Sequence, residues 1–360
     1  MTQNMNQTGS APAGGEKKKN ALEILKNYSG PDVRIMEVCG THTHEIFRLG
    51  IRRILPPNIR LISGPGCPVC VTPVSFIDEA LLLALDHGCT ICTFGDLVRV
   101  PGTSSSLQKA RGTGAKVQVV YSPADAVDYA VRHPEEQVVF LSVGFETTTP
   151  SVCLAVQAAK EQRVENFSVL TANKTMPGAY EAMKDSTDLY LYPGHVHAII
   201  GTGICDDLAK RGVSGVCAGF TASELVTALA VAVTKFEKGE PFFVNCYPRV
   251  VRPQGQPAAV RLVDSMMEPC DSEWRGIGEI PLSGMKLRES FADYDARIKF
   301  ALPKVEGKGN PACRCGEVLQ GKCLPSDCKV FGKVCTPEHP IGACMVSGEG
   351  ACSAFYLYGG

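Results

Sequence analysis

The feature that most constrains the fold is a regular alternation of short β-branched runs with helical stretches, from residue 21 to about residue 245. Such alternation is typical of strands and helices that build a parallel sheet. Nine runs predict strands: VRIMEV, IRLIS, TICTF, KVQVVY, QVVFLSV, FSVLT, DLYLY, VSGVCA and FFVNC. Because nine strands are too many for one small sheet, we expect an α/β protein with more than one lobe.

Two phrases of the sequence indicate that the lobes are alike. SVGFETTTP, at 142–150, and CAGFTASE, at 217–224, both read as a strand, a Gly-Phe turn and a hydroxyl-rich helix start. Internal similarity of this kind indicates a repeated structural unit. We therefore predict two similar parallel-sheet lobes around a cleft, lobe 1 over 21–125 and lobe 2 over 126–245.

The two ends of the chain depart from this pattern. Residues 1–20 are polar and small, and we expect a disordered tail there. After Cys246 the sequence becomes rich in Pro and Arg, and it ends in a stretch with poor apolar periodicity. Because such a stretch needs support other than a hydrophobic core, we predict a third domain over 246–360 that is built around a metal centre.

Charge and hydropathy exclude some classes of function. Lys and Arg number 36 and Asp and Glu number 37, without a basic face, so no nucleic acid partner is expected. The longest apolar runs, such as LVTALAVAV, reach about half of a membrane span, so no membrane crossing is expected. No apolar secretory segment follows the Lys cluster near the start, which predicts a cytoplasmic protein.

The chain has 17 cysteines, an odd number in a long sequence without a secretory segment. Ligand or redox roles are therefore favoured over disulfides. Seven of the cysteines lie in the stretch from Cys313 to Cys352, and none of these has the C-x-x-C spacing of zinc ribbons. The irregular spacing favours a four-thiolate iron-sulfur cluster, with unligated cysteines as the alternative.

Unusual polar motifs follow five of the predicted strands. CGTHTH follows VRIMEV, GPGCPVC follows IRLIS, GD follows TICTF, GFETT follows FLSV, and PGHVH follows LYLY. The carboxyl ends of parallel strands face one crevice, where loops form ligand sites. We therefore expect the five loops to converge on the cleft.

Cys39 precedes a predicted helix that begins near Thr41 or Thr43. The helix dipole favours an anion there, so one interpretation is a reactive or metal-binding thiolate. The other is a buried cysteine that acts as a small hydrophobic residue. His42 and His44 could supply metal ligands or hydrogen bonds to a metal-bound species, or they could be solvated side chains beside a helix cap.

Cys67 and Cys70 form a C-P-V-C motif on a Gly-Pro turn, just before a predicted helix. The helix N-terminus could lower a thiol pKa, as a dithiol switch requires, and a zinc knuckle is the competing interpretation. Cys89 and Cys92 repeat the spacing within a predicted strand. Residues three apart on a strand point to opposite faces, so we do not expect that pair to chelate.

Glu146 in GFETT and His195 in PGHVH lie in tight Gly turns beside the expected cleft. Such positions suit hydrogen bonding to a metal-bound species or proton transfer. A purely structural role in the turn is the alternative for each of them.

The segments CGTHTHEIFRLG, GPGCPVCVTP, GFETT, PGHVHAIIG and CRCGEVLQG with DCKVFGKVCTPEHPIGACMVSGEGAC together resemble the hydrogenase maturation factor HypD family. The resemblance implies two α/β lobes around a cleft and a C-terminal domain that holds a 4Fe-4S cluster. It places the cluster ligands at Cys313, Cys328, Cys335 and Cys352, and it leaves Cys315, Cys323 and Cys344 as extra thiols.

The resemblance also implies a scaffold on which iron acquires carbonyl and cyanide ligands, as an Fe(CN)2CO group, for a nickel-iron hydrogenase. In this interpretation Cys39 binds the iron together with a cysteine of the small partner HypC. Cys67 and Cys70 are the redox-active dithiol, His42 or His195 could hydrogen-bond cyanide, and HypE donates the cyanide. Such a protein is an assembly scaffold with redox chemistry rather than a turnover enzyme.

Two other functions stay open. One is a stand-alone disulfide reductase that uses an iron-sulfur cluster and the C-P-V-C motif. The other is a non-redox binding module whose C-terminal cysteines hold zinc.

Overall fold

The structure, a computed structural model, describes residues 20–359. All nine predicted strands form, and they build two parallel sheets in the orders β2-β1-β7-β8-β9 and β4-β3-β5-β6. The predicted disordered tail lies outside the described residues except for Asn20. The strands are β1 Val33–Glu37, β2 Ile59–Ser63, β3 Thr90–Thr93, β4 Val117–Val119, β5 Val138–Ser142, β6 Phe167–Thr171, β7 Leu189–Pro193, β8 Ser214–Ala218 and β9 Phe243–Asn245.

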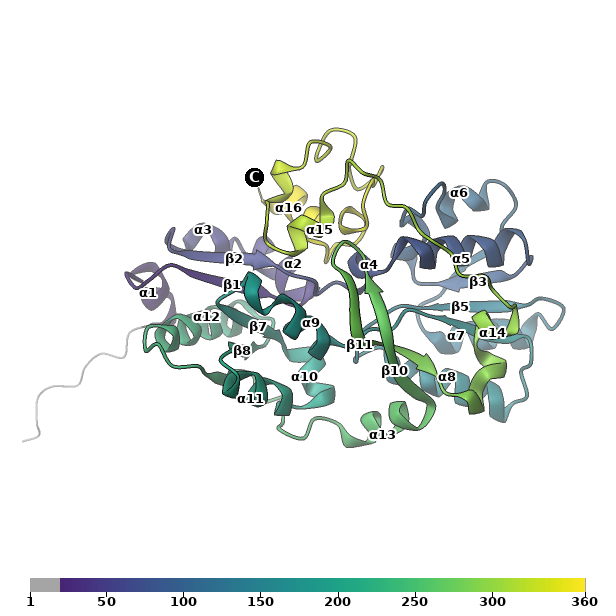
Figure 1. The fold of residues 1–360 in the computed structure, drawn as a ribbon, viewed down its shortest axis with the longest axis horizontal. Helices are drawn as coiled ribbons and strands as arrows, with labels where there is room; N and C mark the ends of the chain where they lie inside the picture. The colour runs from purple at the N-terminus through teal and green to yellow at the C-terminus, as the bar shows by residue number, and fades with distance from the viewer. Residues whose placement is uncertain (1–19, 360) are drawn as a thin grey trace, which may run out of the picture.

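The two sheets and their helices form two lobes side by side along the long axis of the molecule (Figure 1). Lobe A is the five-stranded sheet with α1 Ala21–Lys26, α2 Gly40–Arg48, α3 Ile51–Ile54, α4 Pro68–Val71, α9 Met176–Met183, η2 Lys184–Ser186, α10 Gly194–Ile200, α11 Gly203–Lys210 and α12 Ala222–Phe236. Lobe B is the four-stranded sheet with α5 Val74–Leu85, η1 Gly95–Arg99, α6 Leu107–Arg111, α7 Pro123–Arg132 and α8 Thr149–Glu161. The expected α/β architecture with two parallel-sheet lobes is therefore present.

The lobes resemble each other in topology. Numbered along the chain within each sheet, the strand order is 2-1-3-4-5 in lobe A and 2-1-3-4 in lobe B. The order reverses between β1 and β7 in lobe A and between β3 and β5 in lobe B, and such points are where open α/β sheets bind ligands. The two similar sequence phrases follow β5, the third strand of lobe B, and β8, the fourth strand of lobe A. These strands are not equivalent, so the lobes are similar in strand order and not through those two phrases.

The lobes do not follow the predicted boundary at residues 125 and 126, which falls inside α7. Lobe A takes β1 and β2 from before lobe B and β7 to β9 from after it, and Ile35 of β1 pairs with Leu189 of β7. The periodicity of a sequence indicates where strands lie but not which distant strand each one pairs with. The interrupted lobe could not be inferred for that reason.

The segment between the lobes and the last cysteines also differs from the expected third domain. It contains α13 Pro257–Met266, the antiparallel hairpin β10 Met267–Trp274 and β11 Gly278–Leu287, η3 Glu289–Tyr294 and α14 Ala296–Lys299. Met267 and Leu287 join the core of lobe B, and the hairpin crosses the middle of the molecule (Figure 1). This segment is packed onto the lobes, and the turn of its hairpin also contacts the cysteine tail.

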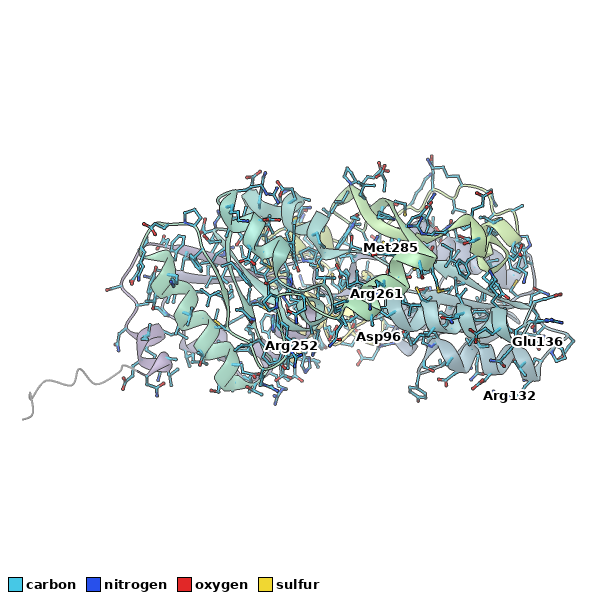
Figure 2. The ribbon with its side chains drawn as sticks, turned by 90° about the horizontal axis from the view of Figure 1, so that it is seen from below. Asp96, Arg132, Glu136, Arg252, Arg261 and Met285 are labelled. Carbon is cyan, nitrogen blue, oxygen red and sulfur yellow. The ribbon has the colours of Figure 1, made fainter. Side chains whose placement is uncertain are left out.

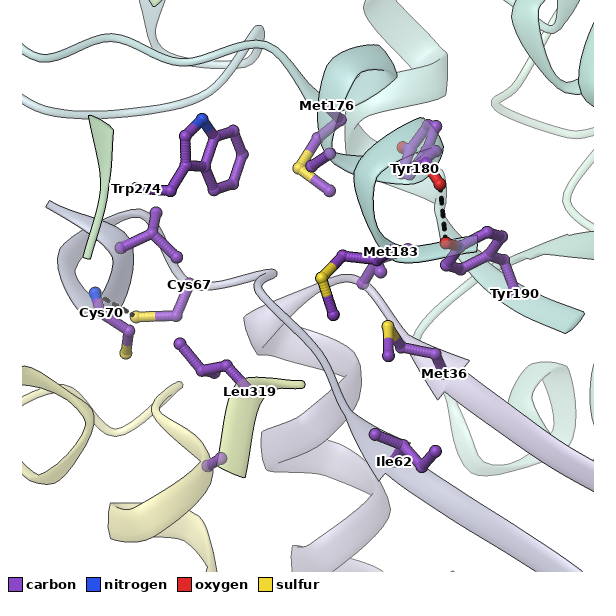
Figure 3. Packing of buried hydrophobic residues seen from close by; sticks show 14 of the residues in the cluster. Met36, Ile62, Cys67, Cys70, Met176, Tyr180, Met183, Tyr190, Trp274 and Leu319 are labelled. Atoms are coloured by element: carbon purple, nitrogen blue, oxygen red, sulfur yellow. Dashed lines mark hydrogen bonds between the residues drawn. The ribbon is translucent and has the colours of Figure 1, made fainter. Parts of the chain in front are cut away.

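The cysteine tail, residues 313–358, lies above the junction of the lobes (Figure 1). It contains α15 Cys315–Leu319, η4 Pro325–Asp327, η5 Ala343–Met345 and α16 Ala351–Tyr358. All of its cysteines except Cys328 join or pack against a central hydrophobic cluster that includes Met36 of β1, Met176 of α9 and Trp274 of β10 (Figure 3). Burial of these apolar surfaces holds the tail, the hairpin and lobe A together. Among residues 20–359, no helix combines the length and the apolarity that crossing a membrane requires.

Candidate functional site

A cavity of about 550 Å³ lies where the carboxyl ends of the two sheets meet the cysteine tail. Figure 2 places Asp96, which lines this cavity, near the middle of the molecule between the lobes. Four of the five loops that were expected to converge, CGTHTH, GPGCPVC, GD and GFETT, each supply part of the wall, whereas the PGHVH loop with His195 does not line it. We call it the interlobe cavity; its lining residues are Thr41, His44, Pro68, Val69, Phe94, Gly95, Asp96, Leu97, Val143, Thr148, Ser347, Gly348 and Glu349.

Cys39 lies beside this cavity as the N-cap residue of α2, one residue before the helix begins. Its side chain is 8% exposed. Burial raises the pKa of the Cys39 thiol to about 12, although the N–H groups of His42 and Thr41 act in the opposite direction. The predicted helix start is present, but the predicted thiolate is not favoured in the metal-free protein. A metal would have to displace the proton of this thiol.

The C-P-V-C loop packs directly on Cys39. The Gly40 N–H donates to the Gly66 carbonyl at 2.9 Å. A Cβ added at Gly66 would lie 2.1 Å from the backbone nitrogen of Cys39, so only glycine fits between the two loops. Cys67 follows Gly66 directly, and the iron-binding candidate therefore lies next to the dithiol candidate.

Cys67 is the N-cap residue of α4, and its sulfur accepts the N–H of Cys70 at 3.3 Å (Figure 3). The helix is only four residues long, so its dipole is small. Burial raises the pKa of the Cys70 thiol well above its usual value, opposite to the predicted lowering. The Cys70 thiol also hydrogen-bonds to Cys344 of the tail, which connects the C-P-V-C loop with the C-terminal cysteines.

His42 and His195 both stack on the ring of Phe220, at centroid distances of 4.6 and 3.8 Å. The Nε2–H of His42 donates to the Gly219 carbonyl at 3.0 Å. Burial lowers the pKa of His42 to about 4, so this ring is neutral and its Nδ1 is a lone-pair acceptor. Within the described part of the chain that Nδ1 is buried and has no hydrogen-bond partner, which leaves it available to a ligand.

Glu349 of the tail reaches the same loops and was missed by the sequence analysis. Its Oε1 accepts the Thr41 hydroxyl at 2.6 Å, and its charge acts on both Cys39 and His195. His44 donates from Nδ1 to the Gly348 carbonyl at 3.0 Å, so it connects α2 with the tail. The available signal was that Glu349 is the one charged side chain between Cys344 and Cys352.

Glu146 is buried and is not part of the wall of the interlobe cavity. Its Oε1 accepts the N–H of Met176 at 2.8 Å, which ties the loop after β5 to the start of α9. Burial raises the pKa of Glu146 to about 7, and Oε2 has no partner among the described residues. The carboxyl group can therefore exchange a proton near neutral pH.

The tail cysteines gather around Cys313. The Cys313 thiol lies 3.2 Å from that of Cys315, and it interacts with Cys335 and Cys352. Cys328 points its sulfur at the carbonyl of Ala312, the residue before Cys313, at 3.7 Å. A group of thiols of this kind suits an iron-sulfur cluster, because the several irons of a cluster are each bound by a cysteine thiolate.

Other sequence candidates lie apart from this site. Cys89 and Cys92 belong to different hydrophobic clusters on opposite faces of the lobe B sheet, as the strand argument predicted.

Among residues 20–359, the three side chains whose metal-donor atoms all lie within 4.8 Å of one another are His133, Glu135 and Glu136. This group is at the far end of lobe B, where Figure 2 shows Glu136, and it contains no cysteine.

Comparisons with known proteins show the family of this chain. A model of the family described as "Hydrogenase formation hypA family", HypD, matches residues 16–359. The hydrogenase maturation factor HypD of Cupriavidus necator is 43% identical over 343 residues, which are 92% of this chain and 90% of that protein. HypD of Azotobacter vinelandii is 42% identical over 91% of this chain and 89% of its own. HypD of Escherichia coli is 41% identical over 91% of this chain and 89% of its own. The chain therefore belongs to the HypD family of hydrogenase maturation factors.

Proposed function

We propose that this chain is a scaffold on which an iron atom, bound by Cys39 beside the interlobe cavity, receives its cyanide and carbonyl ligands before delivery to a nickel-iron hydrogenase. The observation that carries the proposal is the packing of Gly66 on Cys39, which joins the C-P-V-C loop to the proposed iron ligand beside the cavity. The iron and its ligands are the cargo of this site. A soft thiolate suits such an iron atom.

The second ligand of the iron would be a cysteine of a HypC-type partner, and cyanide would come from a HypE-type partner. The interlobe cavity is open to receive a segment of another protein, with Asp96, Thr148 and Glu349 in its wall. Neutral His42 donates its one ring N–H to the Gly219 carbonyl, so its buried and unpaired Nδ1 can accept a proton-bearing ligand but cannot donate to a cyanide nitrogen. Of the two expected hydrogen bonds to cyanide, this arrangement leaves the one from His195. His195 shares the Phe220 ring with His42 and lies near Glu349.

The residues of the tail fit a four-iron cluster as a resident cofactor. The donor set is made of thiols alone, and Cys313, Cys328, Cys335 and Cys352 would hold the cluster, as the family spacing implies. A bound cluster supplies electrons one at a time. Cys344 and Cys70 would connect it with Cys67, because the thiol of Cys344 hydrogen-bonds to that of Cys70 and to thiols of the tail.

The test of the proposal is maturation of a nickel-iron hydrogenase in a host that lacks its own HypD. We expect Cys39→Ser to keep the fold and the brown colour of the cluster while hydrogenase activity falls to background, because serine offers iron no soft ligand. Cys270→Ser is the matched control, since Cys270 is a half-buried thiol of β10 outside both sulfur groups. Normal maturation by Cys39→Ser would show that the iron is held elsewhere.

A stand-alone iron-sulfur disulfide reductase is the second candidate, favoured by the contact between Cys70 and Cys344. It predicts reduction of a protein disulfide by this chain alone, abolished by Cys67→Ser. The scaffold predicts instead that Cys67→Ser stops maturation and that the isolated chain turns over no disulfide substrate.

A further inference from the structure

Arg275 lies in the turn of the β10–β11 hairpin, between the C-P-V-C loop and the cysteine tail. Its N–H donates to the Val71 carbonyl at 2.9 Å, and its Nε donates to the Thr72 carbonyl at 2.8 Å. Its Nη2 donates to the Pro101 carbonyl at 2.9 Å. The turn thus holds the guanidinium immediately behind the short helix that bears Cys70.

The other side of the turn packs against the tail. A Cβ added at Gly276 would lie 2.5 Å from the Cα of Gly316, which follows Cys315. Gln320, just beyond α15, donates from Nε2 to the Gly276 carbonyl at 2.8 Å. The hairpin turn is therefore wedged between the dithiol candidate and the cysteines of the tail.

The charge of Arg275 has no carboxylate partner among residues 20–359. Its hydrogen-bond acceptors are all carbonyls, and no acidic group lies within ion-pair distance. Two other partly buried arginines behave differently, because Arg52 pairs with Glu37 at 2.5 Å and Arg297 pairs with Glu79 at 2.7 Å. A partly buried cation without an anion is costly, so a counter-charge is expected nearby.

The groups that face Arg275 are sulfurs. Its electrostatic neighbours are Cys315, Cys344, Cys313 and Cys70, which come from the tail and from the C-P-V-C loop. As neutral thiols they leave the guanidinium uncompensated. Of the four, Cys313 is a proposed cluster ligand, and as a thiolate bound to iron it would bring the negative charge of the cluster to this place. Burial lowers the pKa of Arg275, and the interaction with these sulfurs opposes that shift.

We propose that Arg275 is the counter-cation of the iron-sulfur cluster and sets its reduction potential, a role that rests on the proposed cluster in the tail. One-electron reduction adds one negative charge to the cluster and breaks no bond. A fixed positive charge beside the sulfurs stabilises the reduced form and raises the potential, since net charge and hydrogen bonds around a cluster tune it.

The test is a redox titration of the full-length protein with its cluster, followed by electron paramagnetic resonance at electrode-poised potentials. We expect Arg275→Gln to shift the ratio of reduced to oxidised cluster about tenfold toward the oxidised form at a given potential, equivalent to about 59 mV for one electron. Arg275→Lys keeps the charge and should stay close to wild type. Arg297→Gln is the matched control, because its guanidinium is paired with Glu79, and it should leave the potential unchanged.

Each outcome decides the matter. Loss of the cluster in Arg275→Gln with retention in Arg275→Lys would also support the counter-charge. Equal shifts in both variants, loss of the cluster in both, or an unchanged potential in Arg275→Gln would overturn it, since the role would then be structural or absent. A wild-type protein without any iron-sulfur signal would refute the proposed cluster itself, which is a separate failure.

Discussion

At the residue scale, burial determines the protonation of the candidate site. The thiols of Cys39 and Cys70 have raised pKa values and the imidazole of His42 has a lowered one, because the charged form of each is poorly solvated. The metal-free site is therefore neutral at these three side chains. Helix position alone predicted anionic thiols, and it failed because the desolvation of each buried thiolate outweighs the effect of the helix dipole.

A buried histidine outside the site predicts the acid sensitivity of the fold. His197 donates from Nδ1 to the Gly201 carbonyl at 2.8 Å and accepts the Tyr180 hydroxyl at Nε2 at 3.1 Å. Burial lowers its pKa to about 4, so the unfolded chain binds a proton below about pH 6.5 that the folded chain refuses. Stability from this group is present above pH 6.5 and is lost as the pH falls toward 4.

We expect His197 to contribute a loss of about 2 kcal/mol in unfolding free energy between pH 7 and pH 5. Urea unfolding at both pH values measures it, and the loss should be smaller by that amount in His197→Gln. Exposed His87 supplies the control, because His87→Gln should retain the wild-type pH dependence. An identical pH dependence in wild type and His197→Gln would contradict the assignment.

At the scale of elements, two loops from neighbouring strands build the site. β1 and β2 are paired along their full length, from Val33 with Ile59 to Glu37 with Ser63, so the loops that follow them leave the sheet together. Gly66 then lets the second loop lie against Cys39. The sequence predicted that the motifs converge, but not that a glycine would set their separation.

Gly66→Ala tests this contact. The added Cβ meets backbone atoms that cannot rotate away, so we expect a loss of roughly 1–3 kcal/mol in unfolding free energy. Displacement of the C-P-V-C loop should also lower hydrogenase maturation while the cluster colour persists. Gly203→Ala, whose Cβ would meet no atom within 4 Å, is the control for urea unfolding. Wild-type stability and maturation in Gly66→Ala would mean that the two loops do not pack against each other at Gly66.

At the scale of the whole molecule, the sequence predicted the strands, the two similar lobes and the convergence of four of the five named loops. It could not predict that β1 pairs with β7, because that pairing joins segments on both sides of lobe B. Local periodicity also left the contribution of Glu349 unseen, since the tail folds back over α2 only through tertiary packing. The features that the sequence did not predict are therefore contacts between segments that lie far apart along the chain.

The tail offers a prediction about its ligands. Cys328→Ser should abolish the brown colour of the anaerobic protein, because the family spacing makes Cys328 a cluster ligand. Cys344→Ser should keep the colour, since Cys344 hydrogen-bonds to Cys70 and serves as a link between the tail and the C-P-V-C loop. Absorbance and the iron content per chain check both variants. The reverse result would exchange the roles of Cys328 and Cys344.

The most direct measurement of the central claim is infrared spectroscopy of the chain purified anaerobically with its HypC-type partner from a host supplied with iron. The account predicts cyanide and carbonyl stretching bands in the wild-type complex and their loss in Cys39→Ser, with the absorbance of the cluster unchanged. Bands of equal intensity in Cys39→Ser would contradict an iron atom held by Cys39 beside the interlobe cavity.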